Sequence, residues 1–371
     1  MSVLYLIMNS RRKKLDIVDG TNILSVCFIL DHVLMPYRLP FFEGIVEKGF
    51  SVTVMHTGKV MYSNSKVKEH ILQKKTFAKF EYRKLPNISN YDIVVHMQNL
   101  RILNFWILTL NPFRNFKLIH WGIGTSSSNG LKLKKNFISL LRNFLATFSS
   151  AQVLYTDYAL PLFSNFVRNK TFIANNTIFN PNFKDLSLFK KNCFIFIGSL
   201  NKRKCIEILI NSFCHAQNIG IGKLELLIIG DGPEKQQLQI LVDKLQINDS
   251  VKFLGSVSNF KLKEKYFQRA LACISPKQAG LSVLESFSYG VPFICFKDAI
   301  SGGEHLNILN GNNGYLVNSN HEIVEKMVML DRNRDLAKSL GHNAFLFYKN
   351  KMQMSNMIND FVKSFHFVLQ N

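Results

Sequence analysis

The sequence predicts an α/β protein built from two doubly wound, Rossmann-like parallel sheets. Short apolar runs alternate with helical stretches along the chain, which is the pattern of strands joined by crossover helices. The alternation forms two series, separated at 177–191 by a stretch rich in Asn, Pro and charge that is typical of an interdomain linker. With 371 residues the chain is long enough to bury a core in each half. We therefore expect two domains, at 1–185 and 186–350.

Each series contains six apolar runs that predict strands, with connections long enough to hold crossover helices. In the first domain the expected strands are 23–28, 51–55, 91–96, 116–120, 152–155 and 171–174. In the second they are 193–197, 224–229, 251–254, 272–274, 292–296 and 314–317. Helices are expected near 204–218, 233–246, 260–270, 282–289 and 321–340, with a final helical stretch at 345–368.

Composition excludes several classes of protein. Hydrophobic residues make up 47% and charged residues 19% of the chain, which excludes a disordered or fibrous protein. Six scattered cysteines show neither a disulfide framework nor a zinc spacing, which favours a reducing compartment. No apolar run approaches the roughly 20 residues that span a bilayer, and the amino end lacks the order of a secretory signal. We expect a cytoplasmic protein.

The formal net charge of +21 predicts a negatively charged partner. No acidic residue lies between Asp92 and Asp157, and within that stretch 131–148 reads as a basic helix with a Leu/Phe face. This helix could pack on the core with its lysines merely solvated, or it could rest on an anionic membrane surface. The sequence contains no helix-turn-helix, zinc finger or aromatic RNP motif, so nucleic acid is not an expected partner.

Candidate ligand-binding residues gather in the second domain. The expected strand 193–197 runs into a glycine turn at Gly198 that is followed by Lys202, Arg203 and Lys204, and three cations at the end of a strand suit a diphosphate. The alternative is a solvated basic turn. Glu285 is a carboxylate on an otherwise apolar helix; it could accept hydrogen bonds from a ribose diol or pair with a neighbouring lysine.

Through five motifs in a fixed order, the chain resembles family 4 of the retaining nucleotide-sugar glycosyltransferases (glycosyl transferases group 1), of the bacterial surface-polysaccharide type. The motifs are GSLNKRK at 198–204, IIGDGPE at 228–234, VKFLG at 251–255, SPKQAGLSVLESFSYGVP at 275–292 and GGEHLNILNGNNGYLV at 302–317. The resemblance implies the GT-B fold, in which two Rossmann-like domains face a cleft. It also implies that the last helix, 351–371, returns to the first domain.

Site residues follow from the resemblance, position by position. It implies that Lys204 holds the donor phosphate, Glu285 the ribose and Phe253 the base. The full set of implied donor-binding residues is Gly198, Ser199, Arg203, Lys204, Phe253, Lys277, Gly280, Leu281, Ser282 and Glu285. Two positions depart from the family pattern. Ser199 stands where the family has an arginine, and Arg203 could take the place of that arginine. Lys277 stands where the family has the first glutamate of its Glu-x7-Glu motif.

The first domain contributes a candidate catalytic histidine. The resemblance places His120, at the end of the expected strand 116–120, opposite the donor sugar, with His96 as its competitor. It makes His120 and Lys204 the candidate catalytic residues. Because a lysine at position 277 cannot accept hydrogen bonds from sugar hydroxyls, we expect Lys277 to favour an acidic or otherwise unusual donor sugar.

The activity implied is transfer of a sugar from a UDP- or GDP-sugar to a glycan or lipid-linked acceptor, with retention of anomeric configuration. The resemblance implies cell-surface polysaccharide or lipopolysaccharide synthesis, peripheral attachment to the inner face of the cell membrane, and no metal or other cofactor. Two alternatives remain open at this point: a nucleotide-sugar epimerase on the same fold, for which Asp31 and Glu43 are the nearest carboxylates of the first domain, and a non-catalytic subunit that binds sugar nucleotides.

Overall fold

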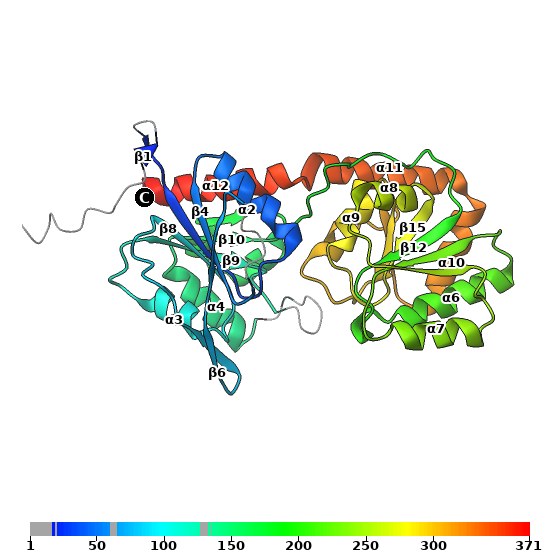
Figure 1. The fold of residues 1–371 in the computed structure, drawn as a ribbon, viewed down its shortest axis with the longest axis horizontal. Helices are drawn as coiled ribbons and strands as arrows, with labels where there is room; N and C mark the ends of the chain where they lie inside the picture. Colours follow the sequence, from blue (N-terminus) through cyan, green and yellow to red (C-terminus); the bar gives the residue numbers. More distant parts are fainter. Residues whose placement is uncertain (1–16, 19–20, 60–64, 127–132, 134) are drawn as a thin grey trace, which may run out of the picture. The chain divides into compact units, whose positions relative to one another are not determined.

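The structure is a computed structural model that describes residues 17–18, 21–59, 65–126, 133 and 135–371 (Figure 1). The chain forms two compact units. Unit 1 contains the described residues up to Gly124, residues Leu133–Ala174 and the carboxyl-terminal segment Met357–Asn371. Unit 2 consists mainly of Asn175–Asn356. The boundary thus follows Ala174, ahead of the linker that the sequence predicts.

Unit 1 is built on a seven-stranded parallel sheet with the order β11-β10-β9-β8-β3-β4-β5. Its strands are β3 (Ser25–Ile29), β4 (Ser51–His56), β5 (Lys68–Ile71), β8 (Ile93–Met97), β9 (Lys117–Gly122), β10 (Ala151–Leu154) and β11 (Thr171–Ile173). Two antiparallel pairs lie outside this sheet: β1 (Ile17–Val18) with β2 (Thr21–Asn22), and β6 (Lys74–Phe77) with β7 (Phe80–Arg83).

Helices cover both faces of this sheet (Figure 1). They are η1 (Pro36–Arg38), α2 (Leu39–Glu47), α3 (Leu103–Leu110), α4 (Phe137–Thr147), η2 (Asp157–Leu162), α5 (Asn165–Arg168) and α12 (Met354–Gln370). Successive residues of a strand point to opposite faces, so Phe28 packs against Phe41 and Phe361 on the α2 and α12 side. Cys27 lies in the cluster that contains Leu108 of α3. The carboxyl-terminal helix therefore supplies part of the core of unit 1.

Unit 2 contains a six-stranded parallel sheet with the order β14-β13-β12-β15-β16-β17. Its strands are β12 (Cys193–Ile197), β13 (Glu225–Ile229), β14 (Val251–Gly255), β15 (Ala270–Ile274), β16 (Phe293–Phe296) and β17 (Gly314–Val317). The helical elements are η3 (Lys202–Lys204), α6 (Ile206–Ile219), α7 (Lys235–Lys244), α8 (Phe260–Gln268), α9 (Ser282–Ser288), η4 (Glu304–Asn307), α10 (Asn320–Arg332) and α11 (Arg334–Lys351). Two apolar clusters, one on each face, form its core.

The predicted fold class, two doubly wound parallel α/β sheets, is confirmed, but three local predictions need correction. Residues 57–90 contain β5 and the β6–β7 hairpin, which the sequence analysis does not predict. The helix predicted at 131–148 begins only at Phe137, because Asn136 and Ser139 form a reciprocal capping box there; residues 131, 132 and 134 lie outside the described part. The helix predicted at 321–340 is interrupted at Asn333, whose side chain caps α11. Within the described residues, no helix is long and apolar enough to cross a membrane.

Candidate functional site

The sheet of unit 2 reverses its strand order between β12 and β15. From β12 the chain adds β13 and β14 on one side and then returns to add β15 on the other. In open α/β sheets, ligands bind in the crevice that such a reversal leaves at the carboxyl ends of the strands. The loops that follow β12 and β15 start at Gly198 and Ser275, so the predicted glycine turn and the predicted loop before Glu285 meet at this crevice.

Glycines let the backbones at this edge approach closely. Gly198 and Gly230 have φ angles of 147° and 142°. A Cβ on Gly230 would lie 1.8 Å from the carbonyl oxygen of Gly198. No side-chain movement could relieve this clash, because the contacted atom belongs to the backbone. A glycine is therefore required at position 230, and the turn of the predicted IIGDGPE motif supports the Gly198 turn from the neighbouring strand.

Lys204 is buried between the two loops of the crevice. Its side chain comes from η3 and its Nζ donates a hydrogen bond to the carbonyl oxygen of Gln278, 3.0 Å away. Only 7% of the residue is exposed, and this burial lowers the pKa of Lys204 to about 8. Among the described residues, no carboxylate lies within ion-pair distance of its Nζ. The ammonium group thus has one neutral partner and remains available for an anion.

Glu285 has a partner within unit 2. Its Oε1 lies 2.5 Å from Nζ of Lys263 on α8, and both side chains are largely buried, with 16% and 15% exposed. This is the ion pair that the sequence analysis gives as the alternative to ribose binding. The carboxylate is held in position by that lysine, and its role toward a ribose stays a prediction.

Two predicted donor-binding residues, Lys277 and Phe253, do not line the pocket beside the crevice, although the backbone amide of Lys277 donates a hydrogen bond to the carbonyl oxygen of Lys204. Nζ of Lys277 lies 3.2 Å from Asp298 and 3.9 Å from the ring centroid of Phe296, so its charge is already engaged. Phe253 lines a different pocket together with α7 residues. Neither residue belongs to the pocket beside the crevice.

That pocket has a volume of about 480 Å³. Its lining residues come from three loops of unit 2: Arg203, Gln278, Ala279, Gly280, Ile300, Ser301, Gly302 and Glu304. Of the remaining predicted residues, Ser199 accepts a hydrogen bond from the Asn201 side chain at 2.7 Å, and the Oγ of Ser282 is buried without a partner. Leu281 packs on the core. The structure therefore brings Arg203 and Gly280 together, with Lys204 bonded to the pocket residue Gln278.

Glu304 is the charged pocket residue that the sequence does not indicate. It lies in the predicted GGEHLN motif, is 6% exposed, and accepts hydrogen bonds from Asn176, Ser301 and the Gly302 amide. The signal available in the sequence is an acidic residue directly after two glycines, in the loop that follows an expected strand. The structure is needed to show that its carboxylate lines the pocket.

The candidate catalytic histidine of unit 1 is buried. His120 is 0% exposed and lies within β9 rather than at its end; its Nε2 and the hydroxyl of Thr109 on α3 are 2.9 Å apart. Burial lowers the pKa of His120 well below its ordinary value, and His96, also 0% exposed, has its pKa lowered to about 4 by burial. Both imidazoles are neutral near pH 7. The catalytic role of His120 stays a prediction, and its burial argues against direct contact with substrate.

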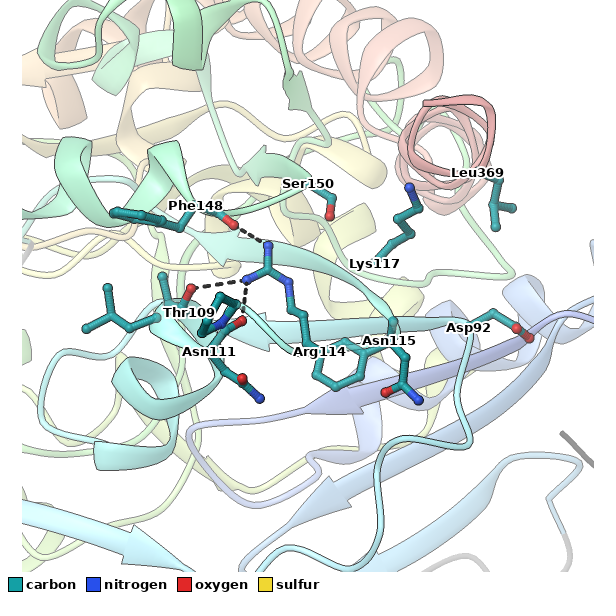
Figure 2. Close-up of a pocket in the computed structure, with 12 residues that line it drawn as sticks. Asp92, Thr109, Asn111, Arg114, Asn115, Lys117, Phe148, Ser150 and Leu369 are labelled. Atoms are coloured by element: carbon teal, nitrogen blue, oxygen red, sulfur yellow. Dashed lines mark hydrogen bonds between the residues drawn. The ribbon is translucent and has the colours of Figure 1, made fainter. Parts of the chain in front are cut away.

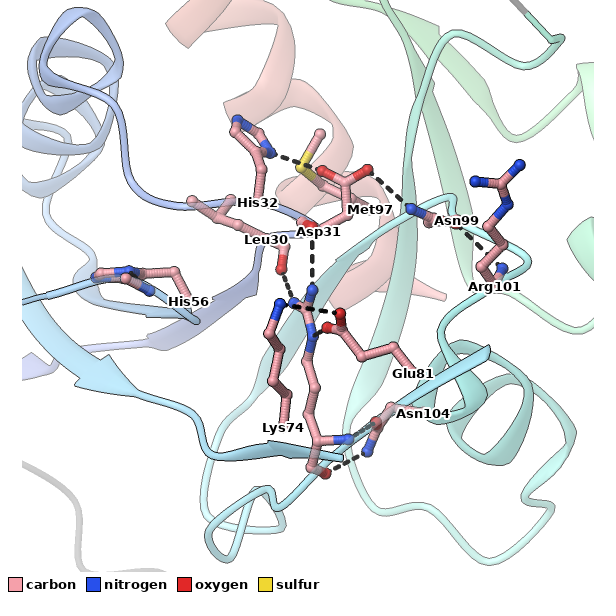
Figure 3. A network of polar contacts seen from close by, with 12 residues as sticks. Leu30, Asp31, His32, His56, Lys74, Glu81, Met97, Asn99, Arg101 and Asn104 are labelled. Atoms are coloured by element: carbon pink, nitrogen blue, oxygen red, sulfur yellow. Dashed lines mark hydrogen bonds and ion pairs between the residues drawn. The ribbon is translucent and has the colours of Figure 1, made fainter. Parts of the chain in front are cut away.

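Polar side chains gather at the switch point of unit 1, where β3 and β8 end (Figure 3). The sequence names Asp31 among them as a candidate carboxylate, but not its partners. Asp31 is 2.6 Å from Nδ1 of His32 and accepts a hydrogen bond from Asn99 at 3.3 Å. The buried guanidinium of Arg83 donates to the carbonyl oxygens of Leu30 and Asp31. Burial alone would raise the pKa of Asp31, but the His32 and Asn99 hydrogen bonds and the charge of Arg83 hold it below its ordinary value. Asp31 is therefore an ionised, preorganised carboxylate.

A pocket of about 670 Å³ in unit 1 lies at the opposite edge of the same sheet (Figure 2). Its lining includes Asp92 and Lys117, which precede β8 and begin β9. Arg114 crosses it and donates to the carbonyl oxygens of Thr109, Asn111 and Phe148. These contacts join the ends of α3 and α4. We interpret Arg114 as structural.

Comparison with known structures defines the class of fold. A glycosyltransferase from Rickettsia africae superimposes with a TM-score of 0.71 at 12% identity, over 95% of this chain and 100% of that one. HepE of Anabaena, crystallised with UDP and glucose, gives a TM-score of 0.64 at 12% identity, over 92% of this chain and 99% of that one. The two parallel α/β units are thus the GT-B fold of glycosyltransferases.

The sequence comparisons then give the family. Residues 179–347 match the family glycosyl transferases group 1. The alpha-monoglucosyldiacylglycerol synthase of Acholeplasma laidlawii is 27% identical over 153 residues, which are 40% of this chain and 37% of that protein. The chain thus matches well under half the length of this curated relative. Residues 179–347, which contain all five motifs, are thus similar to the group 1 (family 4) glycosyltransferases.

Proposed function

We propose that this protein transfers a sugar from a UDP-sugar to a glycan or lipid-linked acceptor at an anionic membrane surface, with retention of anomeric configuration. The observation that carries the donor half is Lys204, a buried ammonium group without a carboxylate partner among the described residues, at the switch point of unit 2. UDP is preferred to GDP because HepE, which shares the fold, was crystallised with UDP and glucose.

The chemistry is substitution at the anomeric carbon. The bond between that carbon and the diphosphate oxygen breaks, the acceptor oxygen forms the new bond, and the acceptor proton leaves with the departing phosphate. Lys204 and Arg203 offset the charge that develops on the diphosphate, an effect that is strong in a site shielded from water. A largely buried cation is suited to this role because its position is fixed before the reaction.

A panel of nucleotides tests the donor half. We expect UDP and UDP-sugars to raise the melting temperature of the full chain more than GDP- or ADP-sugars, since a ligand at a hundred times its dissociation constant stabilises a protein by about 2.7 kcal/mol. Transfer is then measured with and without a lipid-linked acceptor. Conversion of the donor sugar without acceptor would indicate an epimerase, and binding without any turnover a non-catalytic subunit.

The acceptor half depends on the surface of α4 and the end of α3. The helix leaves a stripe of apolar side chains exposed instead of packing it on the core: Phe137 (77%), Leu140 (62%) and Phe144 (53%). Phe113, beyond α3, is 91% exposed. A contiguous exposed apolar surface marks an interaction site, and in a chain of net charge +21 the complementary partner is an anionic lipid surface.

Vesicles test the acceptor half. We expect the protein to bind vesicles of phosphatidylglycerol and phosphatidylcholine, and to bind them less at high salt. The double variant Phe137→Ser, Phe144→Ser should weaken this binding by about tenfold or more, because two aromatic side chains no longer insert into the lipid. The matched control is Leu188→Ser with Ile240→Ser, two exposed apolar residues of unit 2 (79% and 59%). Lys135→Glu tests the charge; its predicted companions Lys132 and Lys134 lie outside the described residues. Equal binding by all variants would refute the membrane role of α4.

A further inference from the structure

We propose that Glu304 binds the hydroxyl groups of the donor sugar and makes the pocket of unit 2 select neutral, hydroxyl-rich sugars over acidic ones. This inference rests on the proposed donor function. It adds to that function the residue that contacts the sugar and the class of sugar that is bound. It also replaces the expectation that Lys277 favours an acidic sugar, since Lys277 is engaged by Asp298.

The first argument is the state of the Glu304 carboxylate. Its Oε2 accepts hydrogen bonds from Ser301 Oγ at 3.0 Å and from the Gly302 amide at 2.8 Å, whereas its Oε1 accepts one from Asn176 Nδ2 at 3.0 Å. A carboxylate offers about four acceptor positions, so Oε1 retains capacity for one more donor. No cation among the described residues lies within ion-pair distance. Neutral donors thus hold this buried charge in the pocket wall.

The second argument is independent and concerns two neighbouring side chains: Asn176, which is bonded to Glu304, and Gln278, which lines the same pocket. Their oxygens, Oδ1 of Asn176 and Oε1 of Gln278, are buried acceptors without any hydrogen-bond partner. Buried polar atoms normally find partners, so unpaired ones mark a place where a ligand completes the network. The unpaired amide oxygens require a donor of hydrogen bonds.

Together these groups define the chemistry of the occupant. A wall that presents the carboxylate of Glu304 and the amide oxygen of Gln278, with the Asn176 amide bonded to that carboxylate, binds a molecule with several hydroxyl donors and repels a second carboxylate. A neutral sugar meets both conditions, whereas a uronic acid meets only the first. Arg203, at the same pocket, is exposed and suits the diphosphate that a donor carries next to its sugar.

The alternative is that Glu304 only stabilises its own loop. A Cβ on Gly302 would lie 3.1 Å from Glu304 Oε2, which shows how closely the loop wraps the carboxylate. A purely structural role would weaken binding of nucleotide and nucleotide-sugar alike. A sugar-binding role weakens only the nucleotide-sugar.

The experiment compares affinities of the full chain, by calorimetry, for UDP, UDP-glucose, UDP-N-acetylglucosamine and UDP-glucuronate. We expect the wild-type protein to bind the better neutral donor at least tenfold more tightly than UDP-glucuronate. Glu304→Gln should weaken neutral-donor binding by about tenfold or more, because hydrogen bonds to a charged group are lost, and should leave UDP within twofold. The variant should also bind the neutral donor and UDP-glucuronate with more similar affinities than the wild-type protein does.

A second variant covers the case in which Glu304→Gln does not fold. Gln278→Ala removes a side-chain oxygen that has no partner, so the fold loses no hydrogen bond to that atom, and we expect several-fold weaker neutral-donor binding with UDP unchanged. Gln237→Ala, on the exposed surface of α7 and outside the pocket that contains Phe253, is the matched control and should change nothing. If a variant loses affinity for UDP and for UDP-sugars equally, or if the wild-type protein binds UDP-glucuronate more tightly than the neutral donors, this inference is wrong but the proposed function stands. Failure of the wild-type protein to bind any nucleotide would overturn the proposed function with it.

Discussion

The switch point of unit 2 and helix α4 of unit 1 differ in what they leave unsatisfied. At its switch point, unit 2 buries a lysine without a carboxylate among the described residues, together with polar atoms such as Gln278 Oε1 that have no partner. Unit 1, on α4, leaves aromatic side chains such as Phe137 in solvent. Buried polar groups and exposed apolar groups are both costly, but they call for opposite partners: a polar ligand in a pocket and an apolar surface. The two regions are therefore expected to serve different partners.

The largest expected effect removes the cation of unit 2. Lys204→Ala should weaken UDP binding by about a hundredfold and abolish detectable transfer, because a charge-assisted contact to the diphosphate is lost from a shielded site. Calorimetry and a transfer assay measure these effects. Lys244→Ala, an exposed lysine on α7, serves as the control. Vesicle binding should not change; if it falls together with UDP binding, the two units do not act separately.

Glu285 allows a sharper test within unit 2. Glu285→Ala should weaken UDP binding by about tenfold or more, because a carboxylate that accepts ribose hydroxyl protons is removed. Lys263→Ala breaks the same ion pair but leaves the carboxylate, so UDP affinity should hold or improve. Equal losses in the two variants would mean that the pair is structural and that the ribose assignment is wrong.

The pKa of Lys204 predicts a pH dependence. Since burial lowers this pKa to about 8, the free protein carries the ammonium form below pH 8 and loses it as the pH rises further. Only the ammonium form attracts the diphosphate, so UDP affinity should be nearly constant up to about pH 7, be about twofold lower at pH 8, and then fall by up to tenfold per pH unit. Lys204→Arg stays charged throughout and should show no such fall. A flat wild-type profile up to pH 9.5 would place the binding charge elsewhere.

His120 provides the contrasting case in unit 1. His120→Ala leaves the Thr109 hydroxyl unpaired and opens a cavity in the core, so the free energy of unfolding should fall by about 1–3 kcal/mol. Measured well below the melting temperature, kcat should stay within about threefold of the wild-type value, and UDP affinity should be unchanged. A hundredfold loss of kcat in the folded variant would instead support a catalytic role for His120.

The sequence predicts the strands well because buried parallel strands are continuous apolar runs, as in Cys193–Ile197, whose five residues are all buried. It does not predict the β6–β7 hairpin, because Lys74–Phe77 is fully exposed and carries no burial pattern. The start of α4 depends on a capping box at Asn136 that periodicity does not show. Lys204 follows β12 as the order of the motifs predicts, whereas its role toward a donor stays a prediction. The direction of a side chain, as for Phe253 and Lys277, and the pocket position of Glu304 required the structure.

The smallest expected effect concerns Lys277. The sequence alone suggests that this lysine reads the donor sugar, so Lys277→Glu would move the preference from acidic toward neutral sugars. In the structure, Nζ of Lys277 is bound by Asp298 and the face of Phe296, both on the strand β16 and the turn after it. An exposed ion pair of this kind contributes about 0–1 kcal/mol, so Lys277→Glu should cost little stability. Affinities for UDP-glucose and UDP-glucuronate should each change by less than about threefold, as measured by calorimetry. A selective gain for UDP-glucose would show that Lys277 reaches the sugar after all, and the selectivity assigned to Glu304 would then have to be shared between the two residues.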